Sequence, residues 1–225
     1  MLTLLDKKFN IDPIVEQVKS LGVFKRLELN TCTGQFFNDP WLTKAEFKNT
    51  PLGDVLDSLE NIGQARLLSL DSGESYTAHC DPDDRIHLPI ITNPYAYLVS
   101  ITDNHLHHIP ATGEIWHMDT GKIHVAANWG ASTRVHLNIR VLLPKYNPLN
   151  AGLRIKVLDG DYNWKQLAYT PIMRIINPAV KNKEITGFKG LSEKEILVNT
   201  NIFSIFDEAV ESIKQCGINL EVEKL

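Results

Sequence analysis

The stretch from Arg66 to Pro144 constrains the fold most, because it reads as a series of short β-strands separated by turn residues. Turn-forming residues at Asp71 to Gly73, Thr92 to Pro94 and Trp129 to Gly130 separate the runs. Six or more short strands at this spacing predict a β-sandwich or jelly roll. The predicted strands run from Arg66 to Leu70, Ile86 to Thr92, Tyr95 to Thr102, Glu114 to Met118, Ile123 to Asn128 and Arg134 to Leu143.

Two of these strands carry polar and apolar side chains in strict alternation. In one, Val135, Leu137, Ile139 and Val141 alternate with Arg134, His136, Asn138 and Arg140. Around Ile86, the pair Arg85 and His87 repeats the pattern. Because alternate residues of a strand face opposite sides of its sheet, we expect the polar faces to line a ligand cavity and the apolar faces to pack beneath helices.

Helical spacing marks segments on both sides of this region. Apolar residues recur every three or four positions over residues 11 to 22 and 51 to 62, and these two helices should pack on the sheet. Residues Ser192 to Glu195 fit a capping box, which predicts a helix start before Ile196. A longer helix is expected over residues 202 to 214, with one apolar face formed by Ile202, Ile205, Phe206, Ala209, Val210 and Ile213.

The predicted fold is therefore mainly β with flanking helices. We expect one domain over residues 1–225, consisting of an N-terminal helical flank (1–65), a β core (66–144) and a C-terminal, partly helical appendage (145–225). Pro148, Pro171 and Pro178 interrupt the pattern of the appendage.

Composition bears on the partners and the compartment. The net charge of −4 and the absence of a dense Lys/Arg run predict neither a nucleic-acid nor a membrane partner. Cys32, Cys80 and Cys216 are an odd number without a CxxC pair, which argues against a disulfide framework and favours a reducing cytoplasm. No run of about 18 apolar residues occurs, and the first charges follow a very short apolar run, the reverse of a signal peptide.

A candidate metal site begins at His79 and Asp81. Residues i and i+2 of an extended chain point to the same side, so both side chains can reach one ion while Cys80 points away. His124, at the start of a predicted strand, is a suitable third ligand, and three ligands on one face leave positions of an octahedral ion open. Arg134 follows after the turn at Gly130, and its guanidinium suits a buried carboxylate. Two imidazoles and one carboxylate are the ligand set of mononuclear non-haem iron(II) oxygenases.

The order and spacing of several motifs carry a family resemblance. Residues Ala78 to Asp81, Arg85 to Pro89 and Gly113 to Trp116 come first, and His124 and Arg134 to Leu137 follow. Over about residues 66 to 144 the chain resembles the aspartyl/asparaginyl β-hydroxylases, iron(II)- and 2-oxoglutarate-dependent dioxygenases that include bacterial proline hydroxylases. Asp81 is present, as in the bacterial branch, whereas some animal members lack the carboxylate ligand.

The resemblance implies roles for particular residues. His79, Asp81 and His124 would be the catalytic iron(II) ligands, and Arg134 would bind the distal carboxylate of the co-substrate 2-oxoglutarate. Arg85 and His87 match positions near co-substrate or substrate. With O2, the protein would hydroxylate an amino acid, free or within a peptide, of the Asp, Asn or Pro type. The implied core is a double-stranded β-helix, the jelly roll of cupin-like proteins.

Other interpretations stay open. A cupin-like protein could bind metal and 2-oxoglutarate without oxygenase activity. A zinc hydrolase could use the same three ligands, but Asp83 and Asp84 are its only obvious carboxylate bases, and it would give Arg134 no purpose. His105, His107 and His108 form a further cluster, for which an exposed strand edge is favoured over a second metal site.

Overall fold

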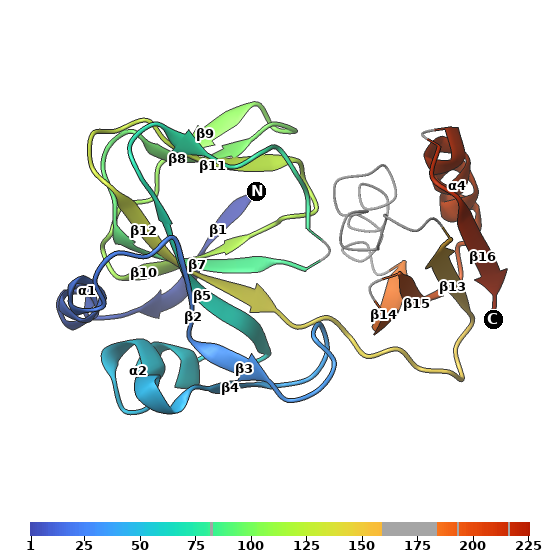
Figure 1. Cartoon of the computed structure of the whole chain (residues 1–225), viewed down its shortest axis with the longest axis horizontal. Coiled ribbons are helices and arrows are strands. Elements are labelled where there is room, and N and C mark those ends of the chain that lie inside the picture. The colour runs from blue at the N-terminus through green and yellow to red at the C-terminus, as the bar shows by residue number, and fades with distance from the viewer. Residues whose placement is uncertain (82, 159–183, 193, 216) are drawn as a thin grey trace.

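A computed structural model describes residues 1–81, 83–158, 184–192, 194–215 and 217–225. As predicted, the fold is mainly β, with antiparallel sheets and few helices. Figure 1 shows two lobes: the strands and helices up to β12 form the larger one, and the elements from β13 onwards form the smaller one.

The larger lobe is built around a six-stranded antiparallel sheet. Its central strands, β7, β12 and β5, pair over most of their length. The order across the sheet is β1 (Leu2–Lys8), β10 (Glu114–Met118), β7 (Arg85–Ile91), β12 (Arg134–Val141), β5 (Ile62–Leu70) and β2 (Arg26–Glu28).

A second, four-stranded antiparallel sheet lies against the first. Leu98 and Ala126 of this sheet share an apolar cluster with Leu70 and Met118 of the six-stranded sheet, so the inner faces of the two sheets pack together. Its order is β6 (Glu74–Ser75), β11 (His124–Asn128), β8 (Ala96–Ser100) and β9 (His105–His107). From β5 to β12 the chain passes back and forth between the two sheets, except that β8 and β9 follow one another in the same sheet.

All six predicted strands are present, as β5, β7, β8, β10, β11 and β12. β6 and β9 were not predicted, because strands of two and three residues are too short to show a period. β9 is an edge strand, and His105 and Leu106 on it are exposed, in agreement with the exposed edge expected around these histidines.

Two helices cover the outer face of the six-stranded sheet, as predicted. The side chain of Asn10 caps α1 (Ile11–Ser20), and the Thr50 hydroxyl accepts a hydrogen bond from Gly53 N at the start of α2 (Pro51–Asp57). α2 ends five residues earlier than predicted, because Asn61 takes a left-handed φ of 55° and the chain enters β5 at Ile62.

The apolar core lies between these helices and the sheet. The alternating strands turn their apolar faces to the helices, which confirms the expectation from their pattern. Buried members include Ile14, Val18, Leu52, Val55 and Leu56 from the helices and Ile86, Leu88, Ile90, Val135, Leu137 and Ile139 from the strands.

The N-terminal flank is not only helical, contrary to the prediction. β1 and β2 form the two edges of the six-stranded sheet, and β3 (Asn30–Cys32) pairs with β4 (Trp41–Thr43) before a short 3-10 turn at Ala45–Phe47. β1 pairs with β10 and β2 pairs with β5, so they satisfy backbone groups that those two strands would otherwise leave unpaired.

The smaller lobe is also a sheet. Four antiparallel strands occur in the order β14 (Ile185–Ser192), β15 (Glu195–Thr200), β13 (Gly152–Val157) and β16 (Leu220–Lys224), with α4 (Ser204–Gln215) beside β16 (Figure 1). The described part of the appendage is thus mostly strand rather than irregular chain. Pro171 and Pro178 lie outside the described residues, as do the side chains of Ile205, Phe206 and Ala209.

The helix start predicted at Ser192 to Glu195 is wrong. Ser192 ends β14 and pairs with Glu195, the first residue of β15, and the Ser192 hydroxyl accepts a hydrogen bond from Lys194 N. β15 is the strand between β14 and β13, and Ile196, Leu197 and Val198 are all buried. Burial on both faces of a sheet outweighs the local capping signal.

An apolar cluster joins the two lobes. Phe37, Cys80 and Leu143 of the larger lobe share it with buried residues of β13 to β16, and the rings of Phe37 and Phe188 lie 5.3 Å apart between centroids. Within the described ranges, none of the helices has the length and apolar character needed to cross a membrane.

Candidate metal centre

His79 and His124, 45 positions apart in the chain, lie directly opposite each other. Each backbone N–H donates to the other residue's carbonyl, at 3.1 and 2.8 Å, in an antiparallel bridge at His124, the first residue of β11. Residues facing each other in such a bridge project their side chains to the same side. The two imidazole rings are therefore brought to 4.5 Å between centroids.

Asp81 completes a triad of potential ligands. Its Oδ2 lies 3.7 Å from His79 Nε2 and 3.8 Å from His124 Nε2, and the three ligand atoms fall within 4.8 Å of one another. As expected from the i, i+2 spacing, Cys80 points the other way, into the apolar cluster between the lobes. In the part of the chain that the structure describes, this is the one group of His, Cys and acidic residues close enough to hold an ion.

Hydrogen bonds orient both imidazoles for metal binding. Nδ1 of His79 lies 2.8 Å from the Thr77 carbonyl, and Nδ1 of His124 lies 2.9 Å from the Lys122 carbonyl. A carbonyl only accepts, so each Nδ1 carries the proton and each Nε2 presents a lone pair toward Asp81. This is the usual arrangement of metal-binding histidines, whose second ring nitrogen donates to a carbonyl or carboxylate.

The protonation states fit the same role. Burial by itself would raise the pKa of Asp81, but the charges of Arg85 and Arg140, with those of the two histidines, bring it down to about 2. Burial, together with repulsion from His79, lowers the pKa of His124 to about 4. At neutral pH the triad therefore offers an ionised carboxylate and a neutral His124 imidazole, the forms that bind a metal.

Arg85 holds the carboxylate ligand in place. Its guanidinium lies 3.0 Å from Asp81 Oδ2 and 2.7 Å from Asp83 Oδ1, and Asp83 is also bound by Arg140 at 2.6 Å. Arg85 and Asp83 are 2% and 1% exposed at their side chains, so this network is buried. Arg85 was predicted near the co-substrate or substrate, and it does line the cavity beside the triad. Its charge is already paired with two carboxylates.

A narrow cavity leads from the triad between the two sheets. Arg134 and His136 of β12 line it, as do His87 of β7 and Asn138. Arg134 is 2% exposed and forms no salt bridge within the described part of the chain, and burial lowers its pKa to about 10, so it is still charged at neutral pH. Its Nη2 donates to His136 Nδ1 at 2.7 Å.

The two buried histidines present N–H groups in this cavity. Because Arg134 donates to Nδ1 of His136, the proton of His136 lies on Nε2. The Asn138 amide donates to His87 Nε2 at 3.1 Å, which places the proton of His87 on Nδ1. Neither of these two N–H groups has a hydrogen-bond partner among the described residues. Burial, with repulsion from Arg134, keeps both pKa values well below 6.5, so both rings are neutral at pH 7.

The cavity wall therefore combines one unneutralised guanidinium with two unpaired imidazole donors. Buried donors without acceptors are costly, and a carboxylate satisfies such a group through charge-assisted hydrogen bonds. The arrangement fits a bound anion next to an open metal site. The sequence predicted Arg134 and His87 as co-substrate residues and left the role of His136 open.

Sequence reasoning missed two further polar residues of this wall, Arg66 and Tyr76. Arg66 pairs with Asn138 across β5 and β12, and Asn138 pairs with His87 across β12 and β7. These three polar residues form one row across the sheet. The sequence places Arg66 at the start of a predicted strand, but only the pairing register between the strands shows that it reaches the site.

The structure counts against two of the other interpretations. Asp83 is bound by Arg85 and Arg140, and Asp84 Oδ2 lies 2.9 Å from His117 Nε2, so neither carboxylate is placed as the base of a zinc hydrolase. His105 and His107 pack ring against ring on the edge strand β9, and they belong to no candidate metal group in the described ranges.

Fold and site together define a β-sheet protein with a candidate mononuclear metal centre and an adjoining anion pocket. The family model described as aspartyl/asparaginyl beta-hydroxylase matches residues 47–144, somewhat less than half of the chain. This confirms the resemblance over the segment that contains the triad and Arg134, and it supports a hydroxylase. A search of curated proteins found no match to this chain.

Proposed function

We propose that this protein is a non-haem iron(II)- and 2-oxoglutarate-dependent dioxygenase that hydroxylates an amino acid, either free or within a peptide, of the Asp, Asn or Pro type. One observation carries the proposal: His79, Asp81 and His124 converge next to a cavity whose wall holds the unpaired guanidinium of Arg134. A metal site alone would fit many proteins, and it is the adjoining carboxylate receptor that points to a 2-oxo acid.

The strand order supports a double-stranded β-helix as the core of this enzyme. β5, β7, β10 and β12 lie in one sheet, and β6, β8, β9 and β11 lie in the other. A chain that passes between two facing sheets in this way winds into a jelly roll. The cavity lies inside it, where both sheets contribute side chains.

The donor set fits iron(II). Two imidazole nitrogens and one carboxylate on one face are the ligands that non-haem iron(II) oxygenases use, with the remaining positions open. When bound, the iron would supply the oxidation in which 2-oxoglutarate, O2 and a substrate C–H bond give succinate, CO2 and a C–OH group. His79, Asp81 and His124 would hold the metal, and Arg85 would keep the carboxylate ligand oriented.

The remaining residues of the cavity bind and orient the co-substrate. Arg134, with the N–H group of His136, would hold the distal carboxylate of 2-oxoglutarate and so direct its 2-oxo acid end toward the metal. His87 lies beside them and offers one more donor. Leu98 and Ala126 of the facing sheet, with Met118 of β10, line the cavity and exclude water from the reacting groups.

The test is co-substrate turnover. Purified protein with iron(II), ascorbate and 2-oxoglutarate should release succinate, and His79→Ala and Arg134→Ala should each abolish this release. The matched control is His107→Ala on the edge strand β9, which should keep the wild-type rate. Turnover retained in both site variants would contradict the proposal. Tight binding of iron(II) and 2-oxoglutarate without succinate release, across a panel of free and peptidyl amino acids, would favour the cupin-like binding protein instead.

A further inference from the structure

A wide groove lies outside the narrow cavity. It encloses about 870 Å³, within the usual range for a small-molecule site. Arg66, Leu68, Tyr76 and His79 line both the groove and the cavity, so the groove opens onto the candidate metal centre. A substrate that approaches the metal would pass through this groove.

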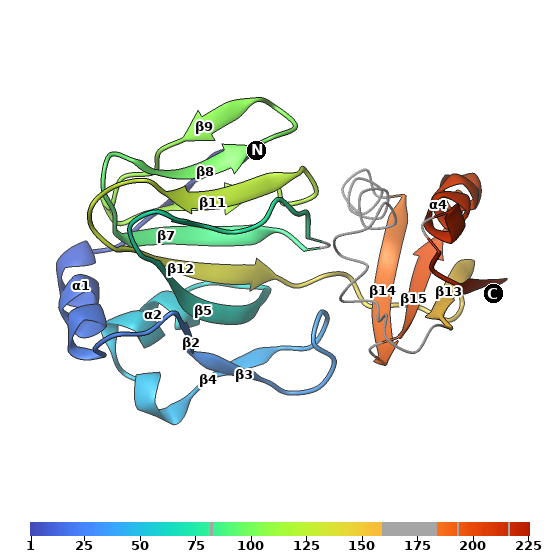
Figure 2. The same ribbon diagram turned by 45° about the horizontal axis from the view of Figure 1, so that its top comes forward.

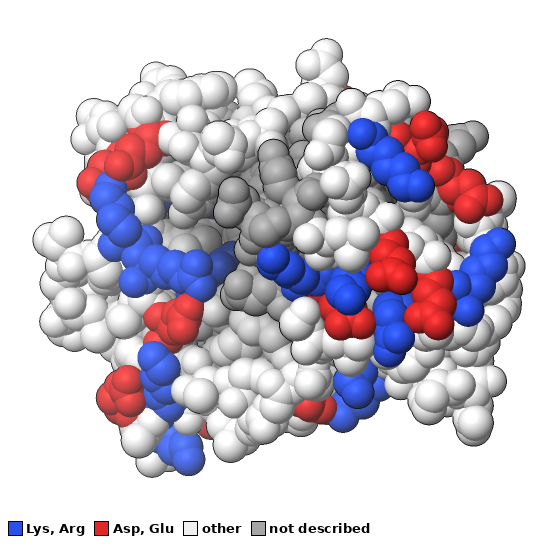
Figure 3. Space-filling model, turned by 45° about the vertical axis from the view of Figure 1, so that its right-hand side comes forward, with Lys and Arg blue, Asp and Glu red and all other residues white. Residues whose placement is uncertain are grey.

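Most cations around the groove already have carboxylate partners. Lys25 Nζ lies 2.7 Å from Asp71 Oδ2 and 2.6 Å from Glu74 Oε1, and Arg26 Nη2 lies 2.6 Å from Glu28 Oε1. Figure 3 shows similar charge pairing on one face of the molecule, where Lys and Arg side chains lie next to Asp and Glu side chains. Paired charges of this kind leave little attraction for a ligand.

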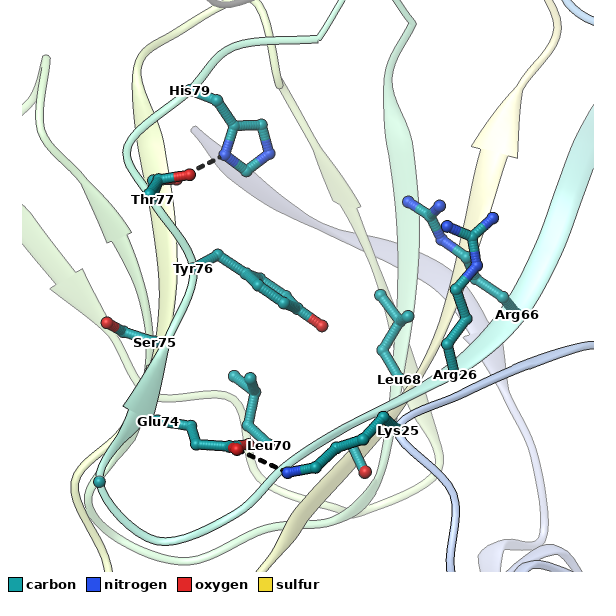
Figure 4. Close-up of a pocket in the computed structure, with 12 residues that line it drawn as sticks. Lys25, Arg26, Arg66, Leu68, Leu70, Glu74, Ser75, Tyr76, Thr77 and His79 are labelled. Carbon is teal, nitrogen blue, oxygen red and sulfur yellow. Dashed lines mark hydrogen bonds and ion pairs between the residues drawn. The ribbon is translucent and has the colours of Figure 1, made fainter.

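Arg66 is different. Nη1 donates to the neutral Gln64 Oε1 at 3.3 Å, Nε is buried without a hydrogen-bond partner, and no salt bridge to Arg66 occurs within the described residues. Glu28, which pairs with Arg66 across the two strands, is bound by Arg26 and by the Gln64 amide. Figure 4 shows the guanidinium groups of Arg66 and Arg26 side by side across the groove from Tyr76 and His79.

The guanidinium of Arg66 is charged, and burying that charge is energetically unfavourable. Burial, with repulsion from Arg140, Arg85 and Arg26, outweighs attraction from Asp81 and lowers the pKa of Arg66 to about 9, which still leaves it protonated at neutral pH. A mostly buried cation without a counter-charge is unfavourable unless an anion comes to it. Asp81 attracts it from a distance, but no carboxylate of the described chain forms a salt bridge with it.

Arg66 and Arg134 line the same cavity but lie at different points along its wall. Arg134 pairs with Leu70 on β5, whereas Arg66 lies four residues earlier on that strand, about 13 Å away at ~3.3 Å per residue. One carboxylate bound by Arg134 would therefore leave Arg66 unneutralised. Two guanidiniums without a salt bridge, at different points of the cavity wall, call for two anionic groups.

We propose that Arg66 binds a carboxylate of the substrate at the mouth of the cavity. The inference rests on the proposed function and deepens it, because it makes the substrate an acid whose reacting C–H bond lies between Arg66 and the triad. The carboxylate can be the α-carboxylate of a free amino acid or the side-chain carboxylate of an acidic one.

The experiment compares acids with their amides. Protein loaded with Mn(II) and N-oxalylglycine, an inert analogue of 2-oxoglutarate, is titrated by calorimetry with three pairs of compounds. Proline against prolinamide and leucine against leucinamide test an α-carboxylate, and glutamate against glutamine tests a side-chain carboxylate. In at least one pair the acid should bind at least ten times more tightly than the amide.

Arg66→Gln should remove this preference by weakening the acid alone, and Arg66→Lys, which keeps the charge, should retain part of it. Lys25→Gln is the matched control, because Lys25 is already bound by Asp71 and Glu74, and it should leave the preference unchanged. Circular dichroism melting of each variant checks that it is folded.

The proposal is overturned if the acid and the amide bind equally in every pair, or if none of the compounds binds. It is also overturned if Arg66→Gln keeps the wild-type preference for the acid. Failure of the metal-loaded protein to bind N-oxalylglycine at all would be a different result, since it contradicts the proposed function itself.

Discussion

The two lobes use the same kind of antiparallel sheet but bury different residues in it. In the larger lobe β7 and β12 are buried on both faces, one face apolar and the other carrying Arg85, His87, Arg134, His136 and Asn138. In the described part of the smaller lobe the buried polar residues are Asn199 and Thr200. Asn199 is satisfied by the backbone: it accepts from Asn147 N at 2.7 Å and donates to Asn147 O at 2.8 Å.

This difference distinguishes buried polar residues that support the fold from buried polar residues that can bind a ligand. Asn199 holds a loop, and its hydrogen bonds are complete within the chain. Arg134, His136 and His87 keep charges and donors that the described chain does not satisfy. Buried charges and donors that a fold leaves unsatisfied around one cavity point to a ligand in it.

The largest effect should come from removing a ligand of the triad. His124→Ala should weaken Mn(II) binding, measured by calorimetry, by more than about 100-fold, since even residues that merely support metal ligands are worth 10- to 100-fold. His105→Ala on the exposed β9 should leave the affinity unchanged. Equal Mn(II) affinities in the two variants would contradict a metal centre in the larger lobe.

Arg134→Met should weaken 2-oxoglutarate binding by about 10- to 100-fold, because charge-assisted hydrogen bonds contribute about 1.5–3 kcal/mol. Its free energy of unfolding should change by no more than about 1 kcal/mol, since the guanidinium that is lost has no carboxylate partner. Arg140→Met is the contrast, because it breaks a buried pair with Asp83 and should cost about 3 kcal/mol. Urea unfolding and calorimetry measure both quantities. A large stability loss in Arg134→Met would make this arginine structural.

The buried histidines should make the protein sensitive to acid. Burial keeps the pKa of His136 well below its unfolded value of 6.5, so the unfolded chain binds a proton that the folded chain does not as pH falls below 6.5. His136 then subtracts about 1.4 kcal/mol of stability per pH unit, a loss absent above pH 6.5. Urea unfolding at pH 7.5 and 5.5 should show a smaller loss in His136→Gln, and an unchanged loss in His105→Gln. An equal loss in all three proteins would contradict the prediction.

The smallest effect is expected from a substitution in the smaller lobe. Ile155→Val in β13 removes one methyl group from the apolar cluster and should lower the free energy of unfolding by about 1 kcal/mol. Mn(II) and 2-oxoglutarate affinities should stay at wild-type values, because this lobe contributes no described residue to the cavity. Altered Mn(II) or 2-oxoglutarate affinities would mean that the apolar cluster containing Cys80 couples the two lobes.

Much of the larger lobe followed from the sequence. Alternation of polar and apolar residues in 134–141 determined which face of β12 is apolar, since a strand turns alternate side chains to opposite sides. The i, i+2 spacing of His79 and Asp81 likewise determined that they share a side and that Cys80 does not. These are local properties of an extended chain, which neighbouring residues decide.

Only the tertiary structure decided the rest. The bridge between His79 and His124 and the register that sets Arg66 beside Asn138 join residues far apart in the chain, and no local pattern specifies such pairing. The strand at Glu195–Thr200 replaced a predicted helix for the same reason, because burial between two neighbouring strands outweighed the capping signal. The sequence by itself determined which residues could perform the chemistry, and long-range strand pairing decided which of them meet.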